Sequence, residues 1–140
     1  MSDGTQLNEL FDEVYSELKA LLNDPNTYGC KIFRQPPNNP FFPNIQLQNE
    51  NKYNGSQTLN YSQRQYPIEY KIELFTIDSG KDTKFLIDSK LEALVIDYMS
   101  SKGFNLSSSH PVVNLDTNVH RRFMRFRAVY DIDSKILYKY

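Results

Sequence analysis

The segment "HRRFMRFRAVYDID", residues 120–133, constrains the fold more than any other part of the chain. Apolar and charged side chains alternate along it, which is typical of a β-strand with one buried face. The apolar face, suited to burial under helices, comprises Met124, Phe126, Ala128 and Tyr130. The opposite face comprises Phe123, Arg125, Arg127, Val129 and Asp131. We therefore expect the arginines of this segment to form one row on the open face of a sheet that is covered on its other side.

A second segment, "YPIEYKIELFTID" (66–78), has the strongest strand pattern and supplies a natural partner for the first. Its apolar face comprises Ile68, Tyr70, Ile72 and Leu74. Glu69, Lys71 and Glu73 share its other face. If the two strands are neighbours, arginine and glutamate meet across the ladder, and each pair contributes roughly 0.2–1 kcal/mol.

Two amphipathic helices provide the cover for such a sheet. The first carries an apolar stripe at steps of three and four residues, has Thr5 as its expected cap and ends before Pro25. The second lies within "SGKDTKFLIDSKLEALVIDYMSSKGF", with Ser79 or Asp82 as its expected cap and Gly103 as its expected terminator. Each helix has one apolar stripe to bury, so we predict an α+β fold: a mainly antiparallel β-sheet with two α-helices packed on one face.

The remaining segments set the expected domain organisation. Residues 1–132 form a single α+β domain, since 140 residues can bury one modest core. Within it, residues 48–66 are expected to form an extended polar arm or loop, because Asn54-Gly55 favours a hairpin turn and the flanks alternate only loosely. Residues 133–140 form a C-terminal aromatic tail with nothing local to pack on.

Composition argues against several classes of function. Sixteen basic residues against seventeen acidic ones do not favour wholesale binding to nucleic acid or to an anionic membrane. The lone Cys30 lies in a strand-like run and is expected to be a buried small hydrophobe. His110 and His120 are ten residues apart without metal-ligand spacing, and we expect both on the surface or in loops. No phosphate loop, nucleophile elbow or membrane-length apolar run is present, so we predict a protein without catalysis or cofactor, made in a reducing cytoplasm.

Several interpretations of the arginine segment remain open. Pairing with glutamates of the same sheet is the first, and an arginine row that faces a partner protein's carboxylates is compatible with it. A sheet-based reader of nucleic acid is the alternative function, in which Arg121, Arg122, Arg125 and Arg127 would bind phosphates and the interleaved phenylalanines would stack on bases. The stretch "RRFMRFR" lacks the glycines and spacing of the RNA-recognition motif. Apart from this segment, a ribonuclease-like enzyme that uses the two histidines is a further possible function.

The order of these segments resembles that of the tail terminator (tail completion) proteins of long-tailed bacteriophages. The likeness covers roughly residues 5–132. It consists of a helix, a strand, the break "QPPNNPFFP", the strand "IEYKIELFTID", a long helix with a "GF" exit at Gly103-Phe104, and a final strand that begins with paired arginines. The segment 48–66 and the aromatic tail depart from that pattern.

The resemblance implies a structural virion protein that forms a ring, commonly a hexamer, without cofactor or catalysis. Such a ring assembles in the host cytoplasm, caps the tail tube and joins it to the head–tail connector, so its expected partners are further copies of itself, the tail tube protein and neck proteins. As a hypothesis that fits such a ring, we expect contacts with subunits and partners at two groups of residues. The first group comprises Arg121, Arg122, Arg125 and Arg127; the second comprises Phe41, Phe42, Tyr53, Tyr61, Tyr138 and Tyr140. For Phe41 and Phe42, simple cover of the sheet edge is an equal alternative.

Overall fold

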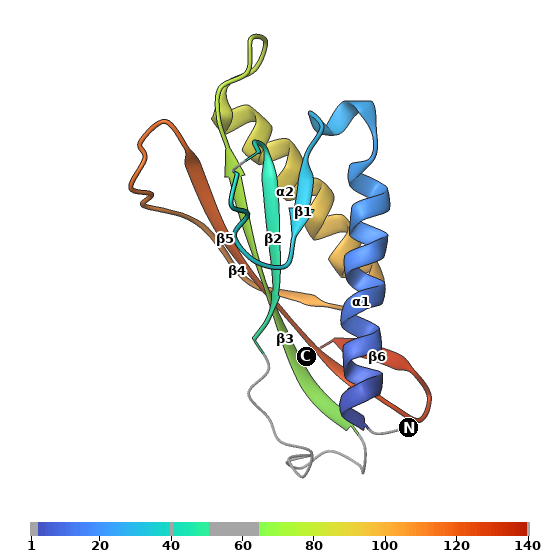
Figure 1. Ribbon diagram of the computed structural model, residues 1–140. Helices are drawn as coiled ribbons and strands as arrows, with labels where there is room; N and C mark the ends of the chain where they lie inside the picture. Colours follow the sequence, from blue (N-terminus) through green and yellow to red (C-terminus); the bar gives the residue numbers. More distant parts are fainter. Residues whose placement is uncertain (1–2, 40, 51–64, 140) are drawn as a thin grey trace.

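The computed structural model describes residues 3–39, 41–50 and 65–139 of the 140-residue chain (Figure 1). Two helices, α1 (Asp3–Leu22) and α2 (Lys84–Lys102), pack on a six-stranded sheet formed by the described residues. The strands are β1 (Lys31–Phe33), β2 (Asn44–Asn49), β3 (Gln65–Thr76), β4 (Asn105–Val112), β5 (His120–Asp131) and β6 (Ile136–Lys139). A short 3-10 helix, η1 (Pro25–Thr27), links α1 to β1.

The sheet is mainly antiparallel, as predicted. Its strands run in the order β1-β2-β3-β5-β4, and β6 pairs with β5 beyond the end of β4. Only the β1–β2 pairing is parallel among the described strands. β5 lies between β3 and the β4–β6 side, and it pairs with β3 over its full length. The α+β class and the adjacency of the glutamate strand and the arginine strand are therefore confirmed.

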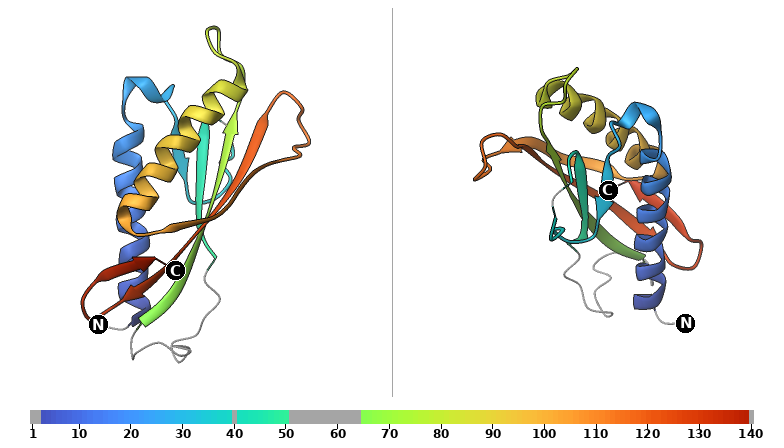
Figure 2. Two further views of the ribbon diagram at one scale, coloured as in Figure 1. Left: turned by 180° about the vertical axis from the view of Figure 1, so that it is seen from behind. Right: turned by 45° about the horizontal axis from the view of Figure 1, so that its top comes forward.

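The core lies between the helices and one face of the sheet, which we call the inner face. Tyr70 of β3 marks this face: its ring meets Phe11 of α1 edge-on, with centroids 5.3 Å apart, and Phe104 after α2, with centroids 5.1 Å apart. The predicted apolar faces of β3 and β5 are buried here with the stripes of both helices. We call the opposite side the outer face; Figure 2 gives two further views of the layers.

A hydrogen bond links the two helices, and α2 ends where the sequence predicted. The predicted N-terminal caps of both helices were wrong. The Tyr98 hydroxyl of α2 donates to Glu17 of α1 at 2.6 Å. Gly103 ends α2 in the left-handed region (φ 119°), as predicted. The cap of α2, however, is Thr83, whose Oγ1 accepts from the Leu86 amide; Thr83 has the extended backbone that a cap needs. Thr5 was the wrong cap for α1, because that helix already begins at Asp3.

Two boundaries predicted from the sequence need correction. Both ends of the expected polar arm at 48–66 belong to the sheet, because β2 continues to Asn49 and β3 begins at Gln65. Residues 51–64, including the expected Asn54-Gly55 turn, lie outside the described part of the chain.

The tail 133–140 was expected to have nothing to pack on, but β6 pairs with β5. Leu137 of β6 also packs so closely over Gly103 that a Cβ at residue 103 would lie 2.8 Å from the Leu137 Cβ. The tail therefore belongs to the domain.

No helix in the described ranges is both long and apolar enough to cross a membrane.

Candidate functional site

The outer face of β5 carries the residues that the alternation predicted. Arg121, Arg125 and Arg127 lie there as three members of one row, which we call the arginine row. In the ladder with β3, Arg125 lies opposite Lys71 and Arg127 opposite Glu69. The sequence pattern thus located this part of the surface correctly.

The arginine row is paired with carboxylates of the neighbouring strand. Arg121 Nε donates to Glu73 Oε2 at 2.6 Å, and Arg127 Nε donates to Glu69 Oε1 at 2.7 Å. Arg125 Nε lies 3.4 Å from Glu69 Oε2. Its orientation does not meet hydrogen-bond geometry, and this buried nitrogen makes no hydrogen bond with the described residues. Two glutamates therefore serve three guanidinium groups, and the predicted arginine–glutamate pairing is confirmed.

The network continues to β2 and stays close to neutral. Lys71 Nζ lies 3.4 Å from Glu50 Oε1 and 3.5 Å from Glu73 Oε1. With the arginine row, this places four cations beside three carboxylates on one face. Such a face gives only a weak electrostatic attraction for a polyanion, because binding a phosphate requires an arginine to exchange one anionic partner for another.

Phe123 lies within this charged face, and its ring contacts three of the neighbouring side chains. The His110 ring of β4 stacks on it, with centroids 5.6 Å apart and an interplanar angle of 29°. The Arg125 guanidinium carbon lies 5.1 Å from the ring centroid, and Lys71 Nζ lies 6.0 Å from it. These are cation–π distances, so the aromatic residue between the arginines already has partners within the chain.

Arg122 does not belong to the arginine row, which corrects the expectation of one row for all four arginines. Consecutive residues of a strand face opposite sides, so Arg122 projects from the inner face toward α2. Its Nε donates to both oxygens of Asp88, at 3.2 and 2.9 Å, and its Nη1 lies 3.1 Å from Glu92 Oε2. Asp88 is only 2 % exposed. This is a largely buried ion pair between sheet and helix, so Arg122 offers little surface to a partner.

The same internal cluster contains His120, whose Nε2 lies 3.3 Å from Asp88 Oδ2. The Ser109 hydroxyl of β4 also joins it through a short hydrogen bond to Glu92 and by accepting from Arg122 Nη1 at 3.1 Å. His120 is thus half-buried at the start of β5, which corrects its expected place on the surface or in a loop, whereas His110 of β4 is exposed, as expected. The serine and the histidine each bond to a carboxylate, and no contact joins the two as nucleophile and base.

The remaining predicted contact residues are divided by the structure. Phe41 is 49 % exposed, with the Lys31 ammonium 5.7 Å from its ring centroid, while Phe42 is half-buried. Tyr138 is exposed on β6. Tyr53, Tyr61 and Tyr140 lie outside the described residues. Phe41 and Tyr138 are available to a partner, and a role for them at an interface remains a prediction.

A feature that the sequence patterns did not single out is the hairpin tip, residues 113–119, which connects β4 to β5. Val113 is 93 % exposed and Leu115 is fully exposed, the two most exposed of the large apolar side chains in the described ranges. Figure 1 shows the tip turned away from α1 and β1. The aliphatic residues Val113 and Leu115 at the start of the turn-rich run "VNLDTNV" were the available signal.

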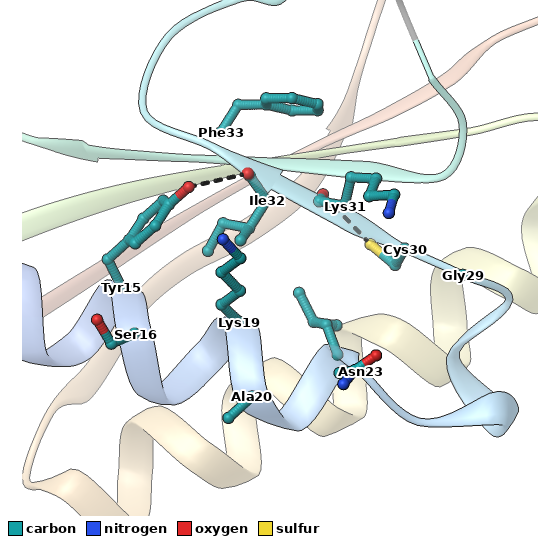
Figure 3. A pocket seen from close by; sticks show the side chains of 11 residues that line it. Tyr15, Ser16, Lys19, Ala20, Asn23, Gly29, Cys30, Lys31, Ile32 and Phe33 are labelled. Atoms are coloured by element: carbon teal, nitrogen blue, oxygen red, sulfur yellow. Dashed lines mark hydrogen bonds between the residues drawn. The ribbon is translucent and has the colours of Figure 1, made fainter.

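On the other side of the molecule, a hollow of about 720 Å³ lies between α1 and the edge strand β1 (Figure 3). Its lining includes Tyr15, Leu22 and Ile32 as well as the side chains of Lys19 and Lys31. Tyr15 reaches from α1 to β1, where its hydroxyl donates to the Ile32 carbonyl at 3.2 Å. The hollow is therefore a seam between two elements, with an apolar floor and cationic sides.

Cys30 also lines this hollow, and it is buried, as predicted. Burial raises the pKa of its thiol to about 12, so the reactive thiolate is scarce at neutral pH. No group of three or more His, Cys, Asp or Glu side chains within the described ranges is arranged to hold a metal ion.

Comparison with protein-family models and with curated proteins yields no match for this chain.

Proposed function

We propose that this protein is a structural virion component, a tail terminator or closely related neck protein, that acts by self-assembly and docking. The element order that resembles that family supports the proposal. The observation that carries it is the pairing of the arginine row: Glu69 and Glu73 of the adjacent strand lie within ion-pair distance of all three guanidinium groups, which a nucleic-acid reader would leave free. A surface of this kind serves sheet integrity and protein–protein contact better than phosphate binding.

In the proposed mechanism, a ring of identical subunits lies on the last layer of the tail tube. The ring occupies the surface on which the next tube subunit would bind, and this stops tube growth. Its opposite side is then presented to the connector. Exposed aromatic side chains such as Phe41 and Tyr138 are suited to these contacts, because a large aromatic side chain buries much area at a small cost in conformational entropy. The chemistry is binding alone, with no catalytic step.

The direct test adds the purified protein to a tail tube protein encoded in the same genome while tubes assemble. Electron microscopy of negatively stained samples measures tube length and the density at each end. The proposal predicts shorter tubes with one capped end. Analytical ultracentrifugation of the protein alone over a wide concentration range should show a multi-subunit species. Unchanged tube lengths with bare ends would contradict the proposal.

The nucleic-acid alternative makes a separate prediction. Retention of DNA or RNA should be salt-sensitive and should disappear in an Arg125→Glu/Arg127→Glu variant. The control is a Lys81→Glu/Lys90→Glu variant, which reverses two exposed cations away from the arginine row. Loss of retention in the first variant alone would favour the alternative. Equal and weak retention by all three proteins is the result that our proposal predicts.

A further inference from the structure

We propose that the hairpin tip of one copy of this chain docks into the hollow between α1 and β1 of a second copy. This inference rests on the proposed function, for which it supplies the contact between neighbouring ring subunits. The proposal gives a binding partner to each of two surface features, the exposed apolar hairpin tip and the hollow.

The hairpin tip presents its apolar side chains from an ordered loop. The Asn118 amide donates to Asp116 Oδ1 at 2.9 Å, and the Val119 amide donates to the Asp116 carbonyl at 3.1 Å. Lys84 Nζ, at the start of α2, donates to the Thr117 carbonyl at 2.9 Å. These bonds hold the loop in one shape without covering Val113 or Leu115. A preorganised apolar tip loses little conformational freedom on docking.

The hollow matches the tip in size and in polarity. A volume of about 720 Å³ is ample for two aliphatic side chains. The floor supplied by Leu22, Cys30 and Ile32 is apolar, so filling it with Val113 and Leu115 would remove apolar surface from water on both copies.

Charge complementarity supports a second copy as the occupant. The hairpin tip carries one charged side chain, the exposed Asp116. The charged side chains that line the hollow, among the described residues, are those of Lys19 and Lys31. The tip's own charge is thus opposite to that of the lysines of the hollow, and opposite charges of this kind help to select a neighbour and to fix its orientation.

The positions of tip and hollow decide the symmetry of the contact. In the sheet order β1-β2-β3-β5-β4, the hollow borders the β1 end and the hairpin tip extends from the β4–β5 end. All views in Figures 1 and 2 place the β4–β5 connection on the opposite side of the molecule from α1 and β1, which border the hollow. Because the two patches differ and lie on opposite sides, two copies cannot fill each other's hollows at the same time, so the contact is heterologous. Heterologous contacts repeat from copy to copy and close into a ring when the rotation permits.

Site-specific crosslinking between two differently tagged proteins tests the contact. One protein carries Leu115→Cys and the other carries Ala20→Cys, an exposed position that lines the hollow. Each is mixed with the other and treated with a short bismaleimide at millimolar protein concentration. The inference predicts a mixed dimer with both tags. The buried Cys30 stays unreactive, and neither protein alone should give the product. The control replaces Leu115→Cys by Leu106→Cys, on the same hairpin and half-exposed.

Two sets of variants measure the strength of the contact in sedimentation equilibrium. Val113→Thr/Leu115→Gln should weaken self-association about tenfold or more, whereas Leu106→Gln should leave it unchanged. Lys19→Glu should weaken association by placing a carboxylate beside Asp116. Adding Asp116→Asn to Lys19→Glu should restore part of it, because asparagine removes the repulsion and keeps the acceptor for the Asn118 amide. All of these side chains are exposed, so loss of folding is not the expected cause of any change.

The outcomes separate this inference from the proposed function. If the protein self-associates but gives no mixed crosslink, and tip variants associate as the wild type does, the tip–hollow contact is overturned and the ring stands on another interface. If no association and no crosslink form at millimolar concentration, the contact is likewise overturned. If the crosslink forms and tip variants lose association, but the protein leaves tail tubes unchanged, the contact stands and the tail terminator function is wrong.

Discussion

The two faces of β5 use the same chemical group in opposite circumstances. On the outer face, Arg127 pairs with Glu69 where water reaches both, since the two side chains are 44 % and 25 % exposed. On the inner face, Arg122 pairs with Asp88 under helix α2, and these side chains are 16 % and 2 % exposed. Both donor–acceptor distances are short, at 2.7 and 2.9 Å.

Burial, more than contact distance, sets what these pairs contribute. An exposed ion pair gains little because water already solvates both charges, and salt screens the attraction. A buried pair also has a modest net value, but each partner depends on the other once water is excluded. The comparison teaches that a row of arginines read from a strand contains two kinds of residue. One kind forms hydrated ion pairs on the surface, and the other forms a buried ion pair that links the sheet to a helix.

The largest effect is expected from Asp88→Ala. This change leaves the Arg122 guanidinium largely buried without its main partner, so the free energy of unfolding should fall by about 3 kcal/mol. Glu92, which lies 3.1 Å from Arg122 Nη1, keeps the loss from being larger. Urea denaturation monitored by circular dichroism measures this loss in the free energy of unfolding.

The control for Asp88→Ala is the double variant Asp88→Leu/Arg122→Met, which removes both charges and keeps apolar volume. It should recover most of the lost stability. A double variant as unstable as the single one would mean that packing, and not the unpaired charge, causes the effect.

A smaller effect is expected from Glu69→Gln on the outer face. It removes the charge that serves Arg125 and Arg127, yet the free energy of unfolding should fall by less than about 1 kcal/mol because these groups stay hydrated. The loss should shrink further in molar salt, whereas the loss from Asp88→Ala should change little. Equal losses for the two variants at low salt would contradict the distinction between the faces.

The smallest effect on stability is expected from changes at Glu17, which links the two helices at the surface. These changes test whether a half-exposed carboxylate contributes as little as the ion pairs of the outer face. The hydrogen bond from Tyr98, followed by the interaction with Lys102, lowers the pKa of Glu17 from its ordinary 4.5. A lowered folded-state pKa means that Glu17 contributes stability above pH 4.5 and that this contribution is lost as pH falls through the lowered value.

Glu17→Gln should therefore flatten the acid limb of the stability curve slightly, which urea titrations at a series of pH values can measure. Tyr98→Phe should flatten the same limb, and the two changes together should be less than additive because they remove one interaction. Additive changes would show that the hydrogen bond between them is not the source of the pH dependence.

Local patterns carried most of the fold. The alternation in β3 and β5 identified the buried and the open faces, and Gly103 marked the end of α2, since these signals lie within a few residues of one another. The pairing of Glu69 with Arg127 also followed, because both lie on the same face of strands that were expected to be neighbours.

Long-range contacts account for the errors. The alternation itself places Arg122 on the inner face, but a buried arginine makes sense only with Asp88, which lies 34 residues earlier in the chain. Strand β6 has four residues and depends on a turn in which the Asp131 carboxylate accepts from the Ser134 amide. A run this short has no periodicity to reveal it. The hollow beside Lys19 was equally hidden, because it exists only where α1 meets β1.

The relay of β4 and β6 along β5 has a consequence for how the molecule opens. β4 pairs with β5 from Arg121 to Arg127, and β6 continues from Ala128 to Asp131, while β3 covers the whole of the other edge. From Arg121 to Asp131, β5 is therefore paired on both sides. Its amide protons should be among the last to exchange with deuterated solvent, on the timescale of global unfolding, while the flanking strands release theirs through smaller openings.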